Sequence, residues 1–134
     1  MGAPQLIVDA SALLAILLRE PDGDRFAKIM SDCEDGLFLS PMNYVEAAIK
    51  ADKTDEATGS ALDYVMKAAG VEIVPVSRDQ ALIAREAYRT YGKGNHPAKL
   101  NLGDCFAYAL SKARGEPLLF KGDDFRLTDV EAVI

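Results

Sequence analysis

Several carboxylates in this sequence are placed so that the fold could bring their side chains close together. Asp9 directly follows an apolar run over residues 6–8, and two adjacent aspartates follow another over residues 118–120. Clustered carboxylates raise one another's pKa, so such a site is stable at neutral pH only when a cation neutralises it. Oxygen ligands alone select magnesium or manganese over zinc. The candidate ligands are Asp9, Glu46, Asp104 and either Asp123 or Asp124.

An oxygen-bound magnesium ion suits one kind of chemistry in particular. It can polarise a phosphoryl oxygen, activate a water molecule as nucleophile and stabilise the leaving oxygen of a phosphodiester. The acidic set therefore predicts a metal-dependent nuclease, with Mn²⁺ able to replace Mg²⁺.

Several of these residues also have a purely local interpretation. Asn101 and Asp104 have the spacing of a capping box, and Ser11 precedes an apolar helix as an N-cap does. We expect Ser11 and Asn101 to orient the carboxylates or a bound water as well. Glu46 borders a buried helix face and Asp9 ends a buried strand, where an unpaired carboxylate is costly.

The elements that must position these side chains alternate along the chain. Strands are expected at residues 6–8, 37–39, 72–76 and 118–120, with a fifth at 130–134, and helices separate them. The helix after residue 40 is expected to bury Met42, Val45, Ala48 and Ile49. This order predicts an α/β fold, a three-layer sandwich with a central parallel sheet, and ligands in such folds bind beyond the carboxyl ends of the strands.

Composition limits the class of protein. The 134 residues, 49% hydrophobic and 27% charged, fit one folded domain over residues 1–134. Two cysteines and one histidine argue against a disulfide framework and a zinc site. No apolar run approaches the roughly 20 residues of a membrane span, and no signal peptide is evident, so we expect a cytoplasmic protein.

Basic residues gather in one stretch although the net charge is −6. Residues 78–99 hold five basic side chains against two acidic ones. We expect Arg85, Arg89, Lys93 and Lys99 to form a basic rim that attracts RNA phosphates, and a solvated helix face is the alternative. Tyr91 and His96 could stack on unpaired bases, although Tyr91 could equally lie at the edge of the core.

The segments around the acids resemble a known family. The strand end at 9–12, the stretch 44–47, the run Asn-Leu-Gly-Asp-Cys-Phe-Ala-Tyr-Ala at 101–109 and Gly-Asp-Asp-Phe at 122–125 are similar to PIN-domain ribonucleases. More narrowly, they resemble the VapC toxins of type II toxin-antitoxin pairs. The resemblance covers essentially the full chain, with the motifs in family order.

The resemblance implies a fold, an activity and partners. The sheet would have the order 3-2-1-4-5, which brings the first and fourth strands together. The family's metal-binding acids map onto Asp9, Glu46 and Asp104, with Asp124 preferred to Asp123 as the fourth. Further implications are magnesium-dependent endonuclease cleavage of structured RNA in single-stranded loops, a homodimer, and inhibition by a VapB-type antitoxin bound near the active site.

Alternatives of other classes stay open. One is a PIN-like RNA-binding module with little catalytic activity. Others are a receiver domain or a phosphoaspartate phosphatase, but the sequence after residue 73 lacks a receiver's aspartate and Ser11 stands where such a phosphatase has a second aspartate. Dinucleotide binding is excluded because no GxGxxG motif follows a strand.

Apolar residues surround the first predicted helix almost completely. Leu13, Leu14, Ile16, Leu17 and Leu18 form more apolar surface than one face against a sheet can bury. We therefore expect exposed apolar side chains there to contact a second copy or an antitoxin.

Overall fold

The computed structural model describes residues 5–33 and 35–134, and residues 1–4 and 34 of the expected domain lie outside that range. Its strands are β1 (Leu6–Val8), β2 (Leu37–Leu39), β3 (Val71–Ile73) and β4 (Leu118–Leu119). Its helices are α1 (Ala10–Leu17), α2 (Gly23–Asp32), α3 (Pro41–Thr54), α4 (Glu56–Ala69), α5 (Arg78–Tyr91), α6 (Leu102–Arg114) and the 3₁₀ turn η1 (Asp124–Leu127). The class is α/β, as the sequence predicts.

The sheet is parallel and has the order β3-β2-β1-β4. In the central strand β1, Ile7 lies opposite Phe38 of β2 and Leu118 of β4. From β3 the chain crosses back past β2 and β1 to β4, so strand order reverses between β1 and β4, and the carboxyl end of β1 lies at that point. The predicted order of the first four strands in the sheet is thus confirmed.

Two strand predictions differ from the structure. The third strand covers Val71–Ile73 rather than 72–76, because Pro75 has no N–H with which to continue the ladder after Val74 donates to the carbonyl of Leu39. The expected fifth strand is reduced to one parallel bridge between Ala132 and Leu118.

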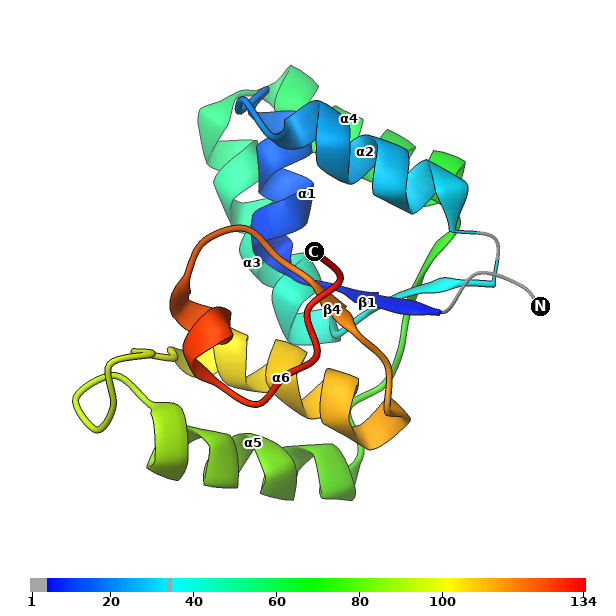
Figure 1. The fold of residues 1–134 in the computed structure, drawn as a ribbon. Coiled ribbons are helices and arrows are strands. Elements are labelled where there is room, and N and C mark those ends of the chain that lie inside the picture. The colour runs from blue at the N-terminus through cyan, green and yellow to red at the C-terminus, as the bar shows by residue number, and fades with distance from the viewer. Residues whose placement is uncertain (1–4, 34) are drawn as a thin grey trace.

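Helices cover both faces of the sheet. Helices α1 to α4 lie on one side and α5 and α6 on the other (Figure 1). Alternation along β1 divides the core in the same way: Leu6 and Val8 belong to the cluster under α1 to α4, and Ile7 belongs to the cluster under α5 and α6. The three-layer sandwich is confirmed.

The buried face of α3 is not the predicted one. Val45 and Ile49 are about half exposed, whereas Asn43, Ala47 and Ala51 are fully buried. The alanines belong to the same core cluster as Ala12 and Ala15 of α1, the helix on which α3 packs. Small side chains let two helix backbones approach closely, and the larger apolar residues of α3 are left at the surface.

The first helix is less exposed than predicted. Leu13 is fully buried, and Leu14, Ile16 and Leu17 are partly buried against the core. Helix α1 is covered by α2, α3 and α4 as well as by the sheet, which accounts for its nearly continuous apolar surface. Leu14, Ile16, Leu17 and Leu18 remain part-exposed, so their contact with a second copy or an antitoxin stays a prediction.

Candidate active site

Asp9 occupies the carboxyl end of the central strand. Its side chain caps α1 by accepting the N–H of Ser11 at 3.0 Å, and Oδ2 also accepts the Ser11 hydroxyl at 2.6 Å. The other oxygen, Oδ1, is buried and has no hydrogen-bond partner. The pKa of Asp9 is raised to about 6, mainly by burial and also by the charge of Glu46, against the lowering effect of the hydrogen bonds from Ser11.

Ser11 links Asp9 to the end of β4. Its Oγ donates to Asp9 and accepts the backbone N–H of Lys121 at 2.9 Å. The Lys121 ammonium forms ion pairs with Glu20 at 3.2 Å and Asp22 at 3.1 Å. Asp9, rather than Ser11, is therefore the N-cap, and Ser11 is placed to orient the Asp9 carboxylate. The sequence predicts no role for Lys121, because only its backbone N–H contacts the site.

Glu46 is held between α3 and α6 by a residue that the sequence analysis missed. The buried amide of Asn43 donates from Nδ2 to Glu46 Oε1 and to the carbonyl of Gly103, both at 3.0 Å. A Cβ on Gly103 would lie 2.3 Å from Glu46 Oε2. The glycine next to Asp104 thus makes room for the Glu46 carboxylate. The three-residue spacing of Asn43 and Glu46 on one helix face was the available signal.

Asp104 lies in the first turn of α6 in a complete capping box. Asn101 Oδ1 accepts the N–H of Asp104 at 2.9 Å, and Asp104 Oδ2 accepts the N–H of Asn101 at 3.0 Å. The pKa of Asp104 is raised to about 7, mainly by burial and against the lowering effect of the Asn101 N–H. The charges of Asp9, Glu46 and Asp124 contribute to this rise. The capping interpretation is confirmed, and the same aspartate is electrostatically coupled to all three other candidate acids.

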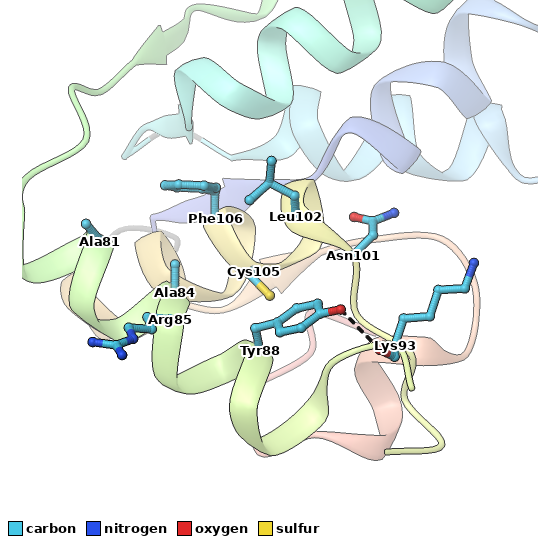
Figure 2. Close-up of a pocket in the computed structure, with 9 residues that line it drawn as sticks. All are labelled: Ala81, Ala84, Arg85, Tyr88, Lys93, Asn101, Leu102, Cys105 and Phe106. Atoms are coloured by element: carbon cyan, nitrogen blue, oxygen red, sulfur yellow. Dashed lines mark hydrogen bonds between the residues drawn. The ribbon is translucent and has the colours of Figure 1, made fainter. Parts of the chain in front are cut away.

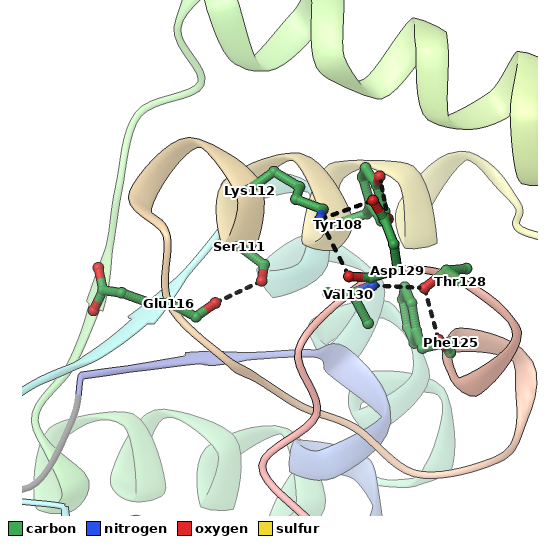
Figure 3. Close-up of polar contacts among 8 residues, drawn as sticks. All are labelled: Tyr108, Ser111, Lys112, Glu116, Phe125, Thr128, Asp129 and Val130. Carbon is green, nitrogen blue, oxygen red and sulfur yellow. Dashed lines mark hydrogen bonds and ion pairs between the residues drawn. The ribbon is translucent and has the colours of Figure 1, made fainter.

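The C-terminal segment brings the fourth acid to this edge. Asp124 opens η1, which is fixed by the buried ring of Phe125 against Phe120. Beyond η1, Asp129 accepts the Tyr108 hydroxyl at 2.6 Å and pairs with Lys112 at 3.0 Å (Figure 3). The Tyr108 hydroxyl and Lys112 hold the pKa of Asp129 below its usual range despite partial burial. Asp124, and not Asp123, is among the charges that raise the pKa of Asp104.

The four acids come from four separate elements and offer only oxygen. Within residues 5–33 and 35–134, no three acidic, cysteine or histidine side chains are arranged tightly enough to enclose a metal ion by themselves. The unpartnered Oδ1 of Asp9 and the mutual charge effects fit a divalent cation that retains several water ligands. Magnesium binds in this way.

The predicted basic rim is only partly assembled. Arg85 and Lys93 line one groove together with Asn101. The guanidinium of Arg89 is exposed and lies 3.6 Å from Glu86, and Lys99 takes a left-handed backbone conformation two residues before Asn101. Two rim residues are thus placed beside the site, while Arg89 has an acidic neighbour that offsets its charge.

Tyr91 and His96 are part-buried and contact each other. Their rings meet edge to face at 5.1 Å, and His96 Nδ1 accepts the N–H of Ala98 at 3.0 Å. Tyr91 also packs on Tyr108. Both rings hold the loop between α5 and α6, and the core-edge interpretation of Tyr91 is confirmed because its ring packs against the core cluster under α5 and α6. Stacking of either ring on an unpaired base stays a prediction.

Comparison with known proteins identifies the family. Residues 6–131 match the family model described as PIN domain. The chain belongs to the PIN-domain family. Within this family it is 49% identical over 129 residues to a ribonuclease VapC of Mycolicibacterium smegmatis, covering 96% of this chain and 99% of that protein. It is 46% identical over 129 residues to a VapC ribonuclease of Mycobacterium bovis, with 96% and 98% covered. The predicted resemblance to PIN-domain VapC proteins is confirmed.

Solved structures share the fold of this PIN domain. The VapC20 toxin of Mycobacterium tuberculosis, described as cleaving the sarcin-ricin loop, superposes with a TM-score of 0.78 at 13% identity over 96% of this chain and 98% of that one. VapBC2 of Rickettsia felis, bound to a DNA fragment of its promoter, gives a TM-score of 0.75 at 13% identity over 96% of each chain. Among the described residues, no helix is long and apolar enough to span a membrane.

Proposed function

We propose that this PIN domain is a magnesium-dependent endoribonuclease and the toxin of a VapBC-type toxin-antitoxin pair. Near-half identity to VapC ribonucleases over almost the whole chain supports the ribonuclease and toxin assignments. One observation carries the chemical part: Asp104 is electrostatically coupled to Asp9, Glu46 and Asp124 at the edge of the sheet where strand order reverses.

In this proposal the carboxylates hold one divalent cation, with Mn²⁺ able to replace Mg²⁺. Asp9 and Asp104 are the principal direct ligands, and Glu46 and Asp124 bind directly or through water. A bound ion of this kind supplies an activated water and stabilises the leaving oxygen of a phosphodiester. Ser11 holds the Asp9 carboxylate in orientation and Asn101 holds that of Asp104.

In this proposal the metal-binding cluster is acidic, whereas the side chains that attract the RNA backbone beside it are basic. A phosphate backbone must approach four carboxylates on a protein of net charge −6. The cation offsets that repulsion within the cluster, and Arg85, Arg89, Lys93 and Lys99 attract the neighbouring phosphates. The substrate we propose is structured RNA, cut by water at a phosphodiester within the chain.

Partners of this domain follow from its relatives. Several solved structures with the same fold are VapBC complexes, including one from nontypeable Haemophilus influenzae that covers 96% of this chain at a TM-score of 0.70. We propose a cognate VapB-type antitoxin as inhibitor, and a homodimer of this chain as the active form.

The test is single-turnover cleavage beside RNA binding, with the wild type, Asp104→Asn and Arg85→Ala. With magnesium the wild type should cut end-labelled structured RNA, and with a chelator it should not. Asp104→Asn should bind RNA without cutting it. Arg85→Ala should lower the salt dependence of binding by about one unit of log K against log salt and leave the chemical step nearly intact. Wild-type cleavage by Asp104→Asn would overturn the proposal.

A further inference from the structure

Three buried oxygen atoms at the acidic cluster have no hydrogen-bond partner among the residues that the structure describes. They are Oδ1 of Asp9, Oγ of Ser40 and Oδ1 of Asn43. Asp9 is 4% exposed, and the other two residues are fully buried. None of the three lines the groove that Arg85 and Lys93 share (Figure 2). Buried polar atoms in native proteins nearly always bond to protein or to an ordered water molecule, so each of these atoms requires an explanation.

Asp9 and Ser40 lie side by side at the carboxyl edge of the sheet. The parallel register pairs Ile7 with Phe38, so two residues further on it pairs Asp9 with Ser40, on strands about 4.8 Å apart. Both residues keep an extended backbone, with ψ of 155° and 142°. Ile7 and Phe38 pack in the cluster under α5 and α6, and residues two apart on a strand share a face. The side chains of Asp9 and Ser40 therefore both face α6.

Asn43 reaches the same place from the first turn of α3. Its Nδ2 donates to the carbonyl of Gly103 in α6 and to Oε1 of Glu46, both at 3.0 Å. Both partners are acceptors, which fixes the orientation of the amide and leaves Oδ1 as a second buried acceptor beside that of Asp9. The charge of Glu46 raises the pKa of Asp9, as expected when the start of α3 lies against the end of β1.

Helix capping does not account for Ser40. The residue occupies the N-cap position of α3, where a serine side chain normally accepts an N–H of the first turn. Its hydroxyl makes no such bond. A buried hydroxyl without any partner lowers stability, and alanine in its place would raise it.

The three atoms match the hydrogen-bonding capacity of one water molecule. Oδ1 of Asp9 and Oδ1 of Asn43 each accept a hydrogen bond, and the hydroxyl of Ser40 can donate one. A buried water typically makes about three hydrogen bonds to polar groups that otherwise lack partners. A cation bound directly by the three oxygens would leave the Ser40 proton without an acceptor.

We propose that Ser40, together with Asn43, holds one water molecule that bonds the free oxygen of Asp9, and that Ser40 is thereby a positioning residue of the acidic cluster. The inference rests on the proposed function: this water fixes Oδ1 from the side of α3, as the hydroxyl of Ser11 fixes Oδ2 from α1. A carboxylate oxygen has two lone pairs, so Oδ1 can accept from the water and still bind the cation. The carboxylate then has one orientation before the ion arrives.

The experiment compares Ser40→Ala with a second buried serine. Ser111 lies near the other end of α6, where its hydroxyl donates to the carbonyl of Glu116 at 2.6 Å (Figure 3). Ser111→Ala therefore also removes a buried hydroxyl, but away from the acidic cluster. Circular dichroism verifies that both variants are folded, and a crystal structure of the wild type grown with a chelator requires no variant.

Metal-free thermal unfolding should show a lower melting temperature for both variants than for the wild type, because each loses a satisfied hydroxyl. Calorimetric titration with magnesium near pH 7 should show about tenfold weaker binding by Ser40→Ala, since loss of an outer partner typically costs about 10–100-fold in metal affinity. Ser111→Ala should bind magnesium as the wild type does. The metal-free crystal structure should contain a water molecule within hydrogen-bond distance of all three oxygens.

A higher melting temperature of Ser40→Ala than of the wild type in the chelator would overturn the inference, because the hydroxyl would then have no partner. Unchanged magnesium affinity of the folded Ser40→Ala protein would overturn the positioning role. So would a crystal structure in which no water bridges the three atoms. Failure of the wild type to cut RNA contradicts the proposed function instead, and the metal-free measurements still decide whether the water is held.

Discussion

At the scale of single residues, Gly103 controls how closely two helices can approach at the acidic cluster. The carboxylate of Glu46 occupies the space that a Cβ at this position would need. The atoms in that space belong to the end of a flexible side chain, so a substitution displaces the carboxylate more easily than it unfolds the helix. A substitution of Gly103 should therefore affect cleavage more than the stability of the fold.

We predict that Gly103→Ala lowers RNA cleavage at least tenfold while the melting temperature changes little, because alanine suits a helix and only Glu46 must move. Gly59→Ala is the matched control, since a Cβ there would meet the Asp52 carboxylate at 2.2 Å far from the acidic cluster. Cleavage rate and thermal unfolding are measured on both. Full activity of Gly103→Ala would show that Glu46 does not act from its present position.

Ser11 offers a second test at this scale. Its hydroxyl lowers the pKa of Asp9, and its removal leaves only backbone N–H groups, those of Ser11 and Ala10, on that carboxylate. Ser11→Ala should reduce cleavage roughly 10–100-fold and move the pH dependence of cleavage to higher pH. Thr58→Ala is the control, because Thr58 makes the same pair of bonds to Asp55 at the start of α4. A fall in melting temperature alone, equal in both variants, would leave Ser11 only a capping role.

The location of a site residue could be predicted from the sequence where the residue directly follows a strand or begins a helix. Asp9 follows a strand and Asp104 opens a helix, so both could be assigned to one edge of the sheet. Asn43 and Gly103 could not be found in this way, because their importance lies in contacts between α3 and α6, which are sixty residues apart in the chain.

At the scale of elements, the site depends on how α3 and α6 are joined. Asn43 is fully buried, and its amide bonds the carbonyl of Gly103 in the first turn of α6. We predict that Asn43→Ala lowers the free energy of unfolding by about 1–3 kcal/mol, because its buried hydrogen bonds to the Gly103 carbonyl and the Glu46 carboxylate are lost. Cleavage should fall as well, since the Asn43 amide no longer donates a hydrogen bond to the Glu46 carboxylate.

Urea unfolding measures this loss, and Asn95→Ala serves as the control. The amide of Asn95 also donates to a backbone carbonyl, that of Tyr88, but at an exposed site. Its removal should change the free energy of unfolding by no more than about 0.5 kcal/mol. Equal effects in the two variants would contradict a special role for the buried bond.

The α3 helix also shows where periodicity fails to predict packing. Val45 and Ile49 repeat at helical spacing, but so do Asn43, Ala47 and Ala51 on the neighbouring face. From the sequence alone, the larger apolar residues are expected to be buried. Close contact with the alanines of α1 instead buries the smaller ones. The bounds of α5 and the end of α6 at Gly115 were predictable, because their caps are local signals.

At the scale of the whole molecule, the acidic cluster makes stability depend on pH. The folded-state pKa values of Asp9, about 6, and Asp104, about 7, lie above the ordinary value of 3.8. The folded protein therefore binds more protons than the unfolded chain between these values. Without metal, the free energy of unfolding should fall as the pH rises from about 4 to about 7.

Urea unfolding in a chelator across this pH range measures the effect. Magnesium should reduce the fall by binding the ionised folded state. The double variant Asp9→Asn/Asp104→Asn should lose most of the slope, since both raised carboxyls are gone. A metal-free stability that rises steadily between pH 4 and pH 7 would contradict the pKa values assigned to the cluster.

The most direct test of the metal site is calorimetric titration of the whole protein with magnesium near pH 7. The wild type should take up magnesium and release protons, because Asp104, with a pKa of about 7, is partly protonated before the ion binds. Asp124→Asn should bind more weakly, Asp123→Asn should bind as the wild type does, and Asp9→Asn/Asp104→Asn should show no uptake. Unchanged magnesium uptake by the folded double variant would contradict the assignment of these carboxylates as the metal site.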